Sequence, residues 1–353
     1  MKDGFVKAAA ASPVIKVADA EYNAQQVIKC MAAAREKGVK LLVFPELTLT
    51  GCFCYDLVGH RVLLEGAAAA LEKVVKASEG TDMLVLVGLP YAFGSRLLSC
   101  AAVVYDGELL ALIPRENVAG SRFADYPGDG ELVYVGALET ELCPGALFAH
   151  RSLNGLTVAV ELGADVTAAD SPTAYYAQSG ATVIAQMASF PATVSSTDDA
   201  LLAARYESKR FACGLVLAAP GKGESTTDNV CSGLCLVSEN GVVLAQDERA
   251  DSMAVSEIDV DFLLNLRRRT GGFDLEAEEL CTALWGGELE ETPLTREYVK
   301  HPHLPARAED VPAYCERVLD IQVSGLVKRM EYAHLDHCVV GISGGVDSTL
   351  AVM

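Results

Sequence analysis

The sequence has 353 residues, of which 51% are hydrophobic, and this allows one large or two ordinary domains with a sizeable buried core. Its 48 acidic residues outnumber the 28 basic ones and give a net charge of −20, so the surface repels phosphate backbones and nucleic acid is not an expected partner. No apolar run approaches the roughly 18 residues of a membrane span, and residues 1–11 lack the apolar core of a signal peptide, so neither a membrane partner nor secretion is expected.

The chain contains 11 cysteines. Several stand in apolar runs, for example Cys213 and Cys231, and we expect them to be buried free thiols in a reducing cytoplasm. Cys52 and Cys54 lack a second pair at zinc-ligand spacing, so no metal site is expected.

From residue 5 to about residue 245, short apolar runs alternate with stretches whose apolar residues recur at helical spacing. Asp106–Gly107 and Asn240–Gly241 each separate two strand-like runs and predict hairpin turns. The expected strands are 5–11, 40–44, 83–88, 101–105, 109–113, 157–162, 182–186, 214–219, 233–237 and 242–245. The expected helices are 18–37, 63–77, 172–180 and 198–211. This alternation indicates an α/β fold with mixed sheets and helices on their faces.

The pattern weakens between residues 265 and 307, where charged residues mix with glycine and proline. We interpret this segment as a linker and its acidic runs at 276–279 and 288–291 as solvated rather than functional. Helical spacing returns at 313–332, so a second domain is expected from residue 308.

The most specific motif lies near the end of the chain, where the apolar run 338–342 leads into Ser-Gly-Gly-Val-Asp-Ser. A buried parallel strand, a glycine turn and a helix start are predicted, so main-chain N–H groups converge and can hold a pyrophosphate. The motif is not a Walker A loop, because the Lys-Ser/Thr ending is missing. The candidate ATP-binding residues are Gly341, Ser343, Gly344, Gly345, Val346, Asp347 and Ser348. Since the chain ends five residues later, we expect the domain that this loop opens to be largely absent.

Several segments together resemble the bacterial glutamine-dependent NAD synthetase family, whose second domain is an ATP pyrophosphatase. They occur in the order of that family along essentially the whole chain: 42–51 (LVFPELTLTG), 221–228, 238–241, 301–305, 320–326 and the phosphate loop. The resemblance implies a nitrilase-like, four-layer α-β-β-α sandwich with a glutaminase domain at 1–264 and a linker at 265–307. It also implies that 308–353 is the truncated start of a Rossmann-like synthetase domain.

The implied reaction uses a glutamate base, a lysine and a cysteine nucleophile to hydrolyse glutamine through a thioester. Ammonia then passes to the synthetase domain, where ATP has adenylated deamido-NAD. The resemblance implies deamido-NAD, ATP and either glutamine or ammonia as ligands, and ATP with Mg²⁺ as cofactors of the complete synthetase. No cofactor is expected for this fragment, and a cytoplasmic homo-oligomer is expected.

The chain departs from the family at two of the three catalytic positions. Glu46 stands at the position of the general base, but Arg115 replaces the lysine and Gly163 replaces the nucleophile. Arginine keeps the charge but not the geometry or the exchangeable proton of lysine. No cysteine lies between Cys143 and Cys213, so a shift of the alignment does not restore the thiol. We therefore predict a degenerate glutaminase site that cannot form a thioester.

Three interpretations of function remain. The first is the N-terminal part of an NAD synthetase that takes ammonia in place of glutamine. The second is a non-catalytic pseudo-glutaminase that serves as a scaffold or oligomerisation module, with Glu46 as a structural remnant capping a neighbouring loop. The third is a carbon-nitrogen hydrolase with an altered nucleophile, for which Thr167 would have to be recruited and against which Gly163 argues. The 353 residues alone are not expected to synthesise NAD.

Overall fold

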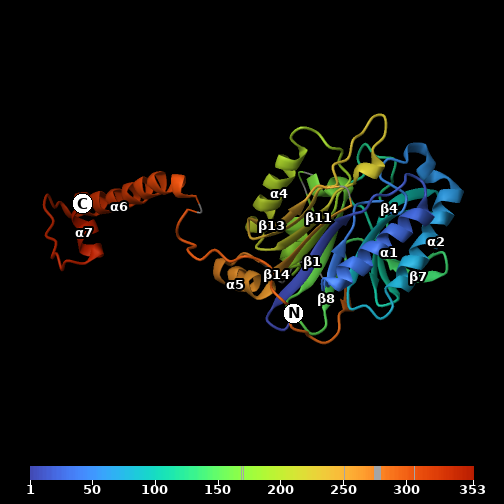
Figure 1. The fold of residues 1–353 in the computed structure, drawn as a ribbon, viewed down its shortest axis with the longest axis horizontal. Helices are drawn as coiled ribbons and strands as arrows, with labels where there is room; N and C mark the ends of the chain where they lie inside the picture. Colours follow the sequence, from blue (N-terminus) through green and yellow to red (C-terminus); the bar gives the residue numbers. More distant parts are fainter. Residues whose placement is uncertain (168, 170, 250, 274–279, 306) are drawn as a thin grey trace. The chain divides into compact units, whose positions relative to one another are not determined.

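The computed structural model describes residues 1–353 except 168, 170, 250, 274–279 and 306 (Figure 1). The chain divides into two compact units, Met1–Arg296 and Glu297–Met353. Among the described residues, no helix combines the length and the apolar character that crossing a membrane requires. All 11 cysteines are free thiols and seven of them are buried, which confirms that part of the prediction.

The first unit contains two mixed sheets. In the described residues, the first sheet has the strand order β14-β1-β2-β3-β4-β5-β7-β6 and the second the order β13-β12-β11-β10-β9-β8-β15. The strands of the first sheet are β1 (Phe5–Ser12), β2 (Leu41–Val43), β3 (Leu84–Phe93), β4 (Arg96–Tyr105), β5 (Glu108–Pro114), β6 (Glu131–Val135), β7 (Leu138–Leu142) and β14 (Ser252–Asp259). Those of the second are β8 (Leu147–His150), β9 (Thr157–Leu162), β10 (Val183–Met187), β11 (Gly214–Ala218), β12 (Cys235–Glu239), β13 (Val242–Asp247) and β15 (Thr282–Trp285).

Helices cover the outer faces of both sheets, so the unit has the predicted four layers. The first sheet is covered by α1 (Ala20–Glu36) and α2 (Arg61–Ala77), and the second by α3 (Thr173–Gln178) and α4 (Ser196–Arg210) (Figure 1). Between the sheets lies an apolar core that includes Val43 of β2 and Val160 of β9, both at most 2% exposed. Both faces of these strands are buried, one in the core between the sheets and the other under the helices, and this explains why the strands are almost wholly hydrophobic.

Local signals fix the ends of several elements. Asp19 caps α1, because its side chain accepts a hydrogen bond from the main-chain N–H of Tyr22 at 3.1 Å. The predicted hairpin turns form at Asp106–Gly107 and Asn240–Gly241, where all four residues have positive φ. Such turns match the right-handed twist of the strands they join.

The predicted linker 265–307 is wrong in its first part. α5 (Val260–Thr270) continues through residue 265, and β15 pairs in parallel with β8. Trp285 of β15 is fully buried, and its Nε1 donates a hydrogen bond to the main-chain oxygen of Phe148 at 3.0 Å. A four-residue strand in charged, glycine-containing sequence gives too short a periodic signal to be recognised. The acidic run 276–279 and residue 306 lie outside the described residues.

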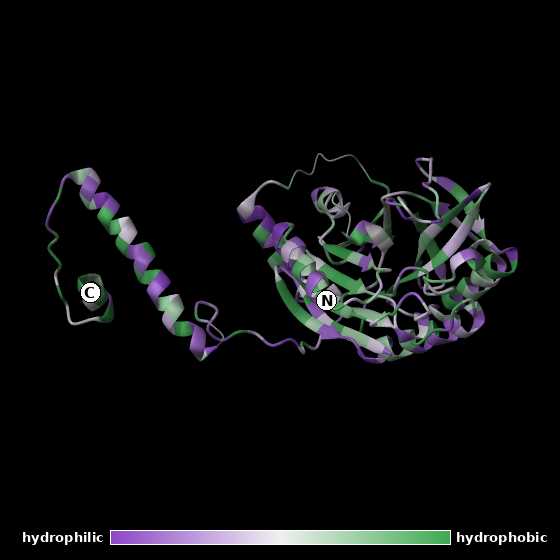
Figure 2. Ribbon diagram, turned by 90° about the horizontal axis from the view of Figure 1, so that it is seen from above, coloured by the Kyte–Doolittle hydropathy of each residue, from purple (hydrophilic) through white to green (hydrophobic). Residues whose placement is uncertain are grey.

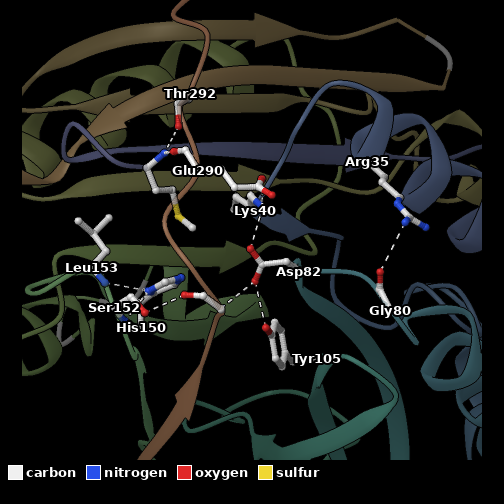
Figure 3. Close-up of polar contacts among 12 residues, drawn as sticks. Arg35, Lys40, Gly80, Asp82, Tyr105, His150, Ser152, Leu153, Glu290 and Thr292 are labelled. Carbon is white, nitrogen blue, oxygen red and sulfur yellow. Dashed lines mark hydrogen bonds and ion pairs between the residues drawn. The ribbon is translucent and has the colours of Figure 1, made fainter.

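We call residues 280–296 the strap, and polar contacts fix it across the first unit. Figure 3 shows Glu290 of the strap beside Lys40, whose Nζ lies 3.1 Å from Oε2 of Glu290 and 2.7 Å from Oδ2 of Asp82. The main-chain N–H of Gly287 donates to the other carboxylate oxygen of Asp82 at 3.1 Å. Arg296 then forms an ion pair with the buried Glu239 at 2.9 Å. The strap is therefore part of the folded unit.

The second unit contains α6 (Val311–Ala333), which confirms the predicted helix, and α7 (Val346–Val352). Figure 2 shows hydrophobic and hydrophilic residues alternating along α6. The predicted strand 338–342 is wrong, since these residues have no strand structure and are exposed. A parallel strand needs a neighbour to satisfy its main-chain groups, and the described part of this unit contains none.

The burial of Trp285 predicts that the strap contributes to stability. Trp285→Ala should lower the free energy of unfolding by about 3–5 kcal/mol, because it leaves a large cavity and removes the edge-on contacts with His150 and Tyr105. Leu284→Ala, on the same strand but 54% exposed, should change it by no more than about 0.5 kcal/mol. Urea unfolding followed by circular dichroism measures both, and equal effects would contradict this role of the strap.

Candidate functional site

The three residues expected at the catalytic positions meet in one place. Glu46 follows β2, Arg115 follows β5, and Gly163 follows β9, so two residues come from the first sheet and one from the second. Glu46 is 1% exposed and Arg115 is 8% exposed. The sequence analysis thus identified three positions that the fold brings into contact although they are far apart in the chain.

The carboxyl group of Glu46 is held by two side chains. Its Oε1 accepts a hydrogen bond from the Ser99 hydroxyl at 2.6 Å and lies 3.4 Å from Nη1 of Arg115. Behind it, Gly88 of β3 leaves room for the chain at Glu46, because a Cβ atom on Gly88 would lie 2.9 Å from the carbonyl carbon of Glu46. Glu46 is therefore held at its carboxyl group and packed at its main chain.

Gly163 lies directly against that carboxyl group. A Cβ atom placed on Gly163 would lie 2.8 Å from both Cδ and Oε1 of Glu46, which is closer than real Cβ atoms approach. The residue also has φ of +55°, a left-handed conformation that glycine adopts freely and other residues adopt at a cost. The carboxyl group of Glu46 thus occupies the space where a nucleophilic side chain at residue 163 would begin.

Arg115 links Glu46 to the loop that follows β5. Its Nε donates to the main-chain oxygen of Asn117 at 2.7 Å while Nη1 faces Glu46. The planar guanidinium is thus held at two of its nitrogens. It provides a positive charge beside Glu46.

Two further carboxyl groups lie on either side of Gly163. Burial raises the pKa of Glu161 to about 7, although its carboxyl group accepts hydrogen bonds from Thr173 at 2.5 Å and Gln186 at 2.9 Å. Burial likewise raises the pKa of Asp165 to about 6, and this carboxyl group accepts from the main-chain N–H groups of Glu116 and Asn117. Asp165 therefore caps the loop after Arg115, a role that had been considered for Glu46.

A fourth carboxyl group comes from the 221–228 segment. Glu224 is 2% exposed and accepts a hydrogen bond from the main-chain N–H of Cys52. Burial raises its pKa to about 7, and the nearby Glu46 adds to this rise. Glu224 and Cys52 fix the loop that follows Glu46.

A cavity of about 300 Å³ opens at this site. It is lined by Glu46, Leu47, Cys52, Phe53, Tyr55, Val58, Arg115, Gly120, Ser121, Arg122, Phe123 and Ser189. The thiol of Cys52 donates to the main-chain oxygen of Glu46 at 2.7 Å. Burial and the neighbouring Glu224 and Glu46 raise the pKa of Cys52 well above its usual value, so this thiol stays protonated and is not an activated nucleophile.

Sequence reasoning missed Ser99, Cys52 and the role of Glu224. Ser99 is a polar residue in the otherwise apolar buried run of β4, which is the one signal that marks it. Cys52 and Glu224 are 172 residues apart, and only the fold brings them together. Ala164 and Thr167 fall in the turn Gly163–Thr167, and their side chains lie outside the described part of the structure.

The phosphate loop lies in the second unit. Gly344 has φ of +83° and Gly345 stands at the N-cap of α7, as the predicted turn and helix start require. The hydroxyl of Ser348 accepts from the main-chain N–H of Ser343 at 3.3 Å and donates to the oxygen of Gly345 at 3.1 Å. The other proposed ATP-binding residues, Gly341, Val346 and Asp347, are exposed.

Comparison with known sequences confirms the resemblance. The carbon-nitrogen hydrolase family profile matches residues 7–267. A glutamine-dependent NAD(+) synthetase from Mycobacterium leprae is 32% identical over 369 aligned positions, covering 99% of this chain and 54% of that protein. One from Aquifex aeolicus is 23% identical, with 94% of this chain and 55% of that protein covered. The chain therefore spans about half the length of these relatives.

Known structures confirm the nitrilase-like α/β fold. A glutamine-dependent NAD(+) synthetase from Cytophaga hutchinsonii superposes with a TM-score of 0.63 at 17% identity, covering 72% of this chain and 43% of that one. An amidase of the nitrilase superfamily from Nesterenkonia AN1 superposes with a TM-score of 0.57 at 17% identity, covering 75% and 95%. In that amidase acrylamide adds to an active-site cysteine.

The raised pKa of Glu224 predicts how stability depends on pH. Because its pKa of about 7 in the folded state exceeds the usual 4.5, protonation favours the folded state. This stabilisation is complete below about pH 4.5 and is lost as the pH rises through about 7. Glu224→Gln should remove this pH dependence. The unfolding free energies of the variant and the parent should therefore differ by an amount that changes by on the order of 3 kcal/mol between pH 4.5 and pH 8.

Urea unfolding across that pH range measures this difference. Val62→Ala, at a 79% exposed position of α2 without an ionisable group, is the control and should give a difference from the parent that does not change with pH. A pH-independent difference for Glu224→Gln as well would show that Glu224 is not buried as described.

Proposed function

The chain belongs to the carbon-nitrogen hydrolase family, and we propose that its first unit is a glutaminase-type domain that no longer hydrolyses glutamine. We propose further that it forms part of a cytoplasmic NAD synthetase that takes free ammonia. The contact between Gly163 and Glu46 supports this proposal most directly. A thioester requires a thiol at the end of β9, and here that position has no side chain and faces a carboxyl group.

Among the described residues that line the cavity, Cys52 carries the one thiol. Burial keeps that thiol protonated while it donates to the main-chain oxygen of Glu46. Arg115 also differs from the lysine of the family, because its guanidinium contacts both the carboxyl group of Glu46 and the main-chain oxygen of Asn117 in the following loop. Without a nucleophile, Glu46 has no proton to accept from a catalytic thiol.

The role in NAD synthesis rests on the relatives and on the phosphate loop. All three NAD synthetases compared above are described as glutamine-dependent, and the alignment with the Mycobacterium leprae protein covers 99% of this chain and so includes the Ser-Gly-Gly-Val-Asp-Ser motif. We propose that the complete protein adenylates deamido-NAD with ATP and Mg²⁺ and that residues 341–348 bind the pyrophosphate. The partner substrate would then be ammonia, since glutamine cannot be cleaved.

One observation favours the second candidate, a scaffold that supports assembly into a homo-oligomer. Leu202 and Tyr206 lie one turn apart on α4 and are 70% and 60% exposed. Adjacent exposed apolar side chains on an outer helix are typical of an interface. This role is compatible with the first, because a domain without hydrolytic activity can still position its neighbour.

Glutamate release tests the loss of glutaminase activity. The chain incubated with glutamine should release no glutamate above the rate without protein, whereas a double variant, Gly163→Cys with Arg115→Lys, should release it measurably. Gly163→Cys requires the end of the Glu46 side chain to shift within its contacts with Ser99 and residue 115, and the left-handed conformation costs a further ~1–2 kcal/mol.

Cys52→Ser is the matched control for that assay. This substitution removes the Cys52 thiol from the cavity. In the parent it should leave glutamate release absent, and in the double variant it should leave the rate of glutamate release unchanged. Glutamate release by the parent that Cys52→Ser abolishes would contradict the proposal and would identify Cys52 as the nucleophile.

A fusion tests the second half of the proposal. Residues 1–353 joined to the part of the Mycobacterium leprae relative that lies beyond the alignment should make NAD from deamido-NAD and ATP with ammonium. The fusion should make none with glutamine. NAD formation driven by glutamine in a preparation free of ammonium would refute the proposal, and the native relative serves as the positive control for both nitrogen donors.

A further inference from the structure

We propose that Glu141, Cys143 and Cys281 form a binding site for a thiophilic divalent cation, with Zn²⁺ as the best match. The site is separate from the Glu46 cavity and does not depend on the proposed function. It was not expected from the sequence, because Glu141 and Cys281 are 140 residues apart and no paired spacing marks them.

The three ligand atoms already lie close together. One carboxylate oxygen and two sulfur atoms are all within 4.8 Å of one another, and Sγ of Cys281 is 3.9 Å from Oε2 of Glu141. Typical Zn–S and Zn–O bonds at a tetrahedral angle separate a sulfur from an oxygen ligand by about 3.6 Å. Movements of a few tenths of an ångström would therefore bring this pair to bonding geometry.

The main chain holds the two cysteines in place. The N–H of Cys143 donates to Leu112 of β5 at 3.1 Å, and the oxygen of Cys281 accepts from Leu147 of β8 at 2.8 Å. Glu141 is paired within the β6–β7 hairpin. The ligands thus come from the first sheet and from the start of the strap, so a bound cation would tie the strap to β7.

The donor set also decides which cation is preferred. Two thiolates and one carboxylate suit Zn²⁺ and disfavour Ca²⁺ and Mg²⁺, which prefer oxygen ligands. Glu141 and Cys281 are exposed and Cys143 is buried, so a water molecule can reach the fourth position. The net charge of −20 further favours cation binding.

Binding must release protons. Burial raises the pKa of Cys143 to about 12, with Cys281 and Glu141 adding to the effect. Zn²⁺ binds cysteine as the thiolate, so the proton of Cys143 leaves to solvent when its Zn–S bond forms. Affinity should consequently increase with pH.

Competition with a chromogenic chelator tests the site in the whole chain, reduced and freed of metal. One equivalent of Zn²⁺ should bind, and Co²⁺ in its place should give a sulfur-to-metal charge-transfer absorption. Cys281→Ser and Glu141→Gln should each weaken Zn²⁺ binding about 10- to 100-fold. Cys315→Ser, which removes an exposed cysteine of α6, is the matched control and should bind Zn²⁺ like the parent.

Thermal unfolding gives a second readout. Zn²⁺ should raise the midpoint temperature of unfolding for the parent and for Cys315→Ser but not for Cys281→Ser. The proposal is overturned if the reduced chain binds no stoichiometric Zn²⁺, if Cys281→Ser binds it like the parent, or if Cys143 and Cys281 form a disulfide and their reduced form binds no metal. None of these results affects the proposed function, which is tested by glutamate release.

Discussion

The contact between the carboxyl group of Glu46 and the main chain of Gly163 determines what this site can do. Three neighbours of Glu46 support that position: Ser99 donates to it, Arg115 faces it, and Gly88 leaves room behind it. In a hydrolase of this kind a base must stand beside a nucleophile, with space between them for the substrate. Here the carboxyl group of Glu46 lies where a side chain at residue 163 would begin, and this contact supports the proposal that the site is kept as a structure without its covalent chemistry.

The buried carboxyl groups around this contact belong to the architecture of the site. Glu161, Asp165 and Glu224 have raised pKa values because they are buried, and each accepts hydrogen bonds that fix a loop or a neighbouring side chain. Groups of this kind often mark active sites, but they also serve as structural supports. Their hydrogen bonds hold the turn after β9 and the loops after β2 and β5, so they maintain the scaffold around residue 163.

Sequence reasoning predicted the layers of sheets and helices, and the positions around Glu46, better than the structure of the strap and of residues 338–342. Long apolar strands and amphipathic helices such as α1 carry a strong periodic signal, and Glu46, Arg115 and Gly163 were identified because the resemblance aligned them. The sequence of the strap resembles that of a linker, because β15 has four residues and its burial depends on Trp285 reaching the core beside Phe148. The expected strand at 338–342 failed for the opposite reason, since its apolar residues have no neighbouring strand to pair with in the described part of that unit. Contacts between distant segments, such as Cys52 with Glu224, give no local signal.

Intact-mass measurement after incubation with an electrophilic analogue of glutamine tests the central claim most directly, because it detects covalent attack without requiring turnover. The account predicts an unchanged mass for this chain and one covalent equivalent for the double variant Gly163→Cys with Arg115→Lys. A stoichiometric adduct on the parent chain, mapped to a residue of the Glu46 cavity, would contradict the account and would place the nucleophile elsewhere in that cavity.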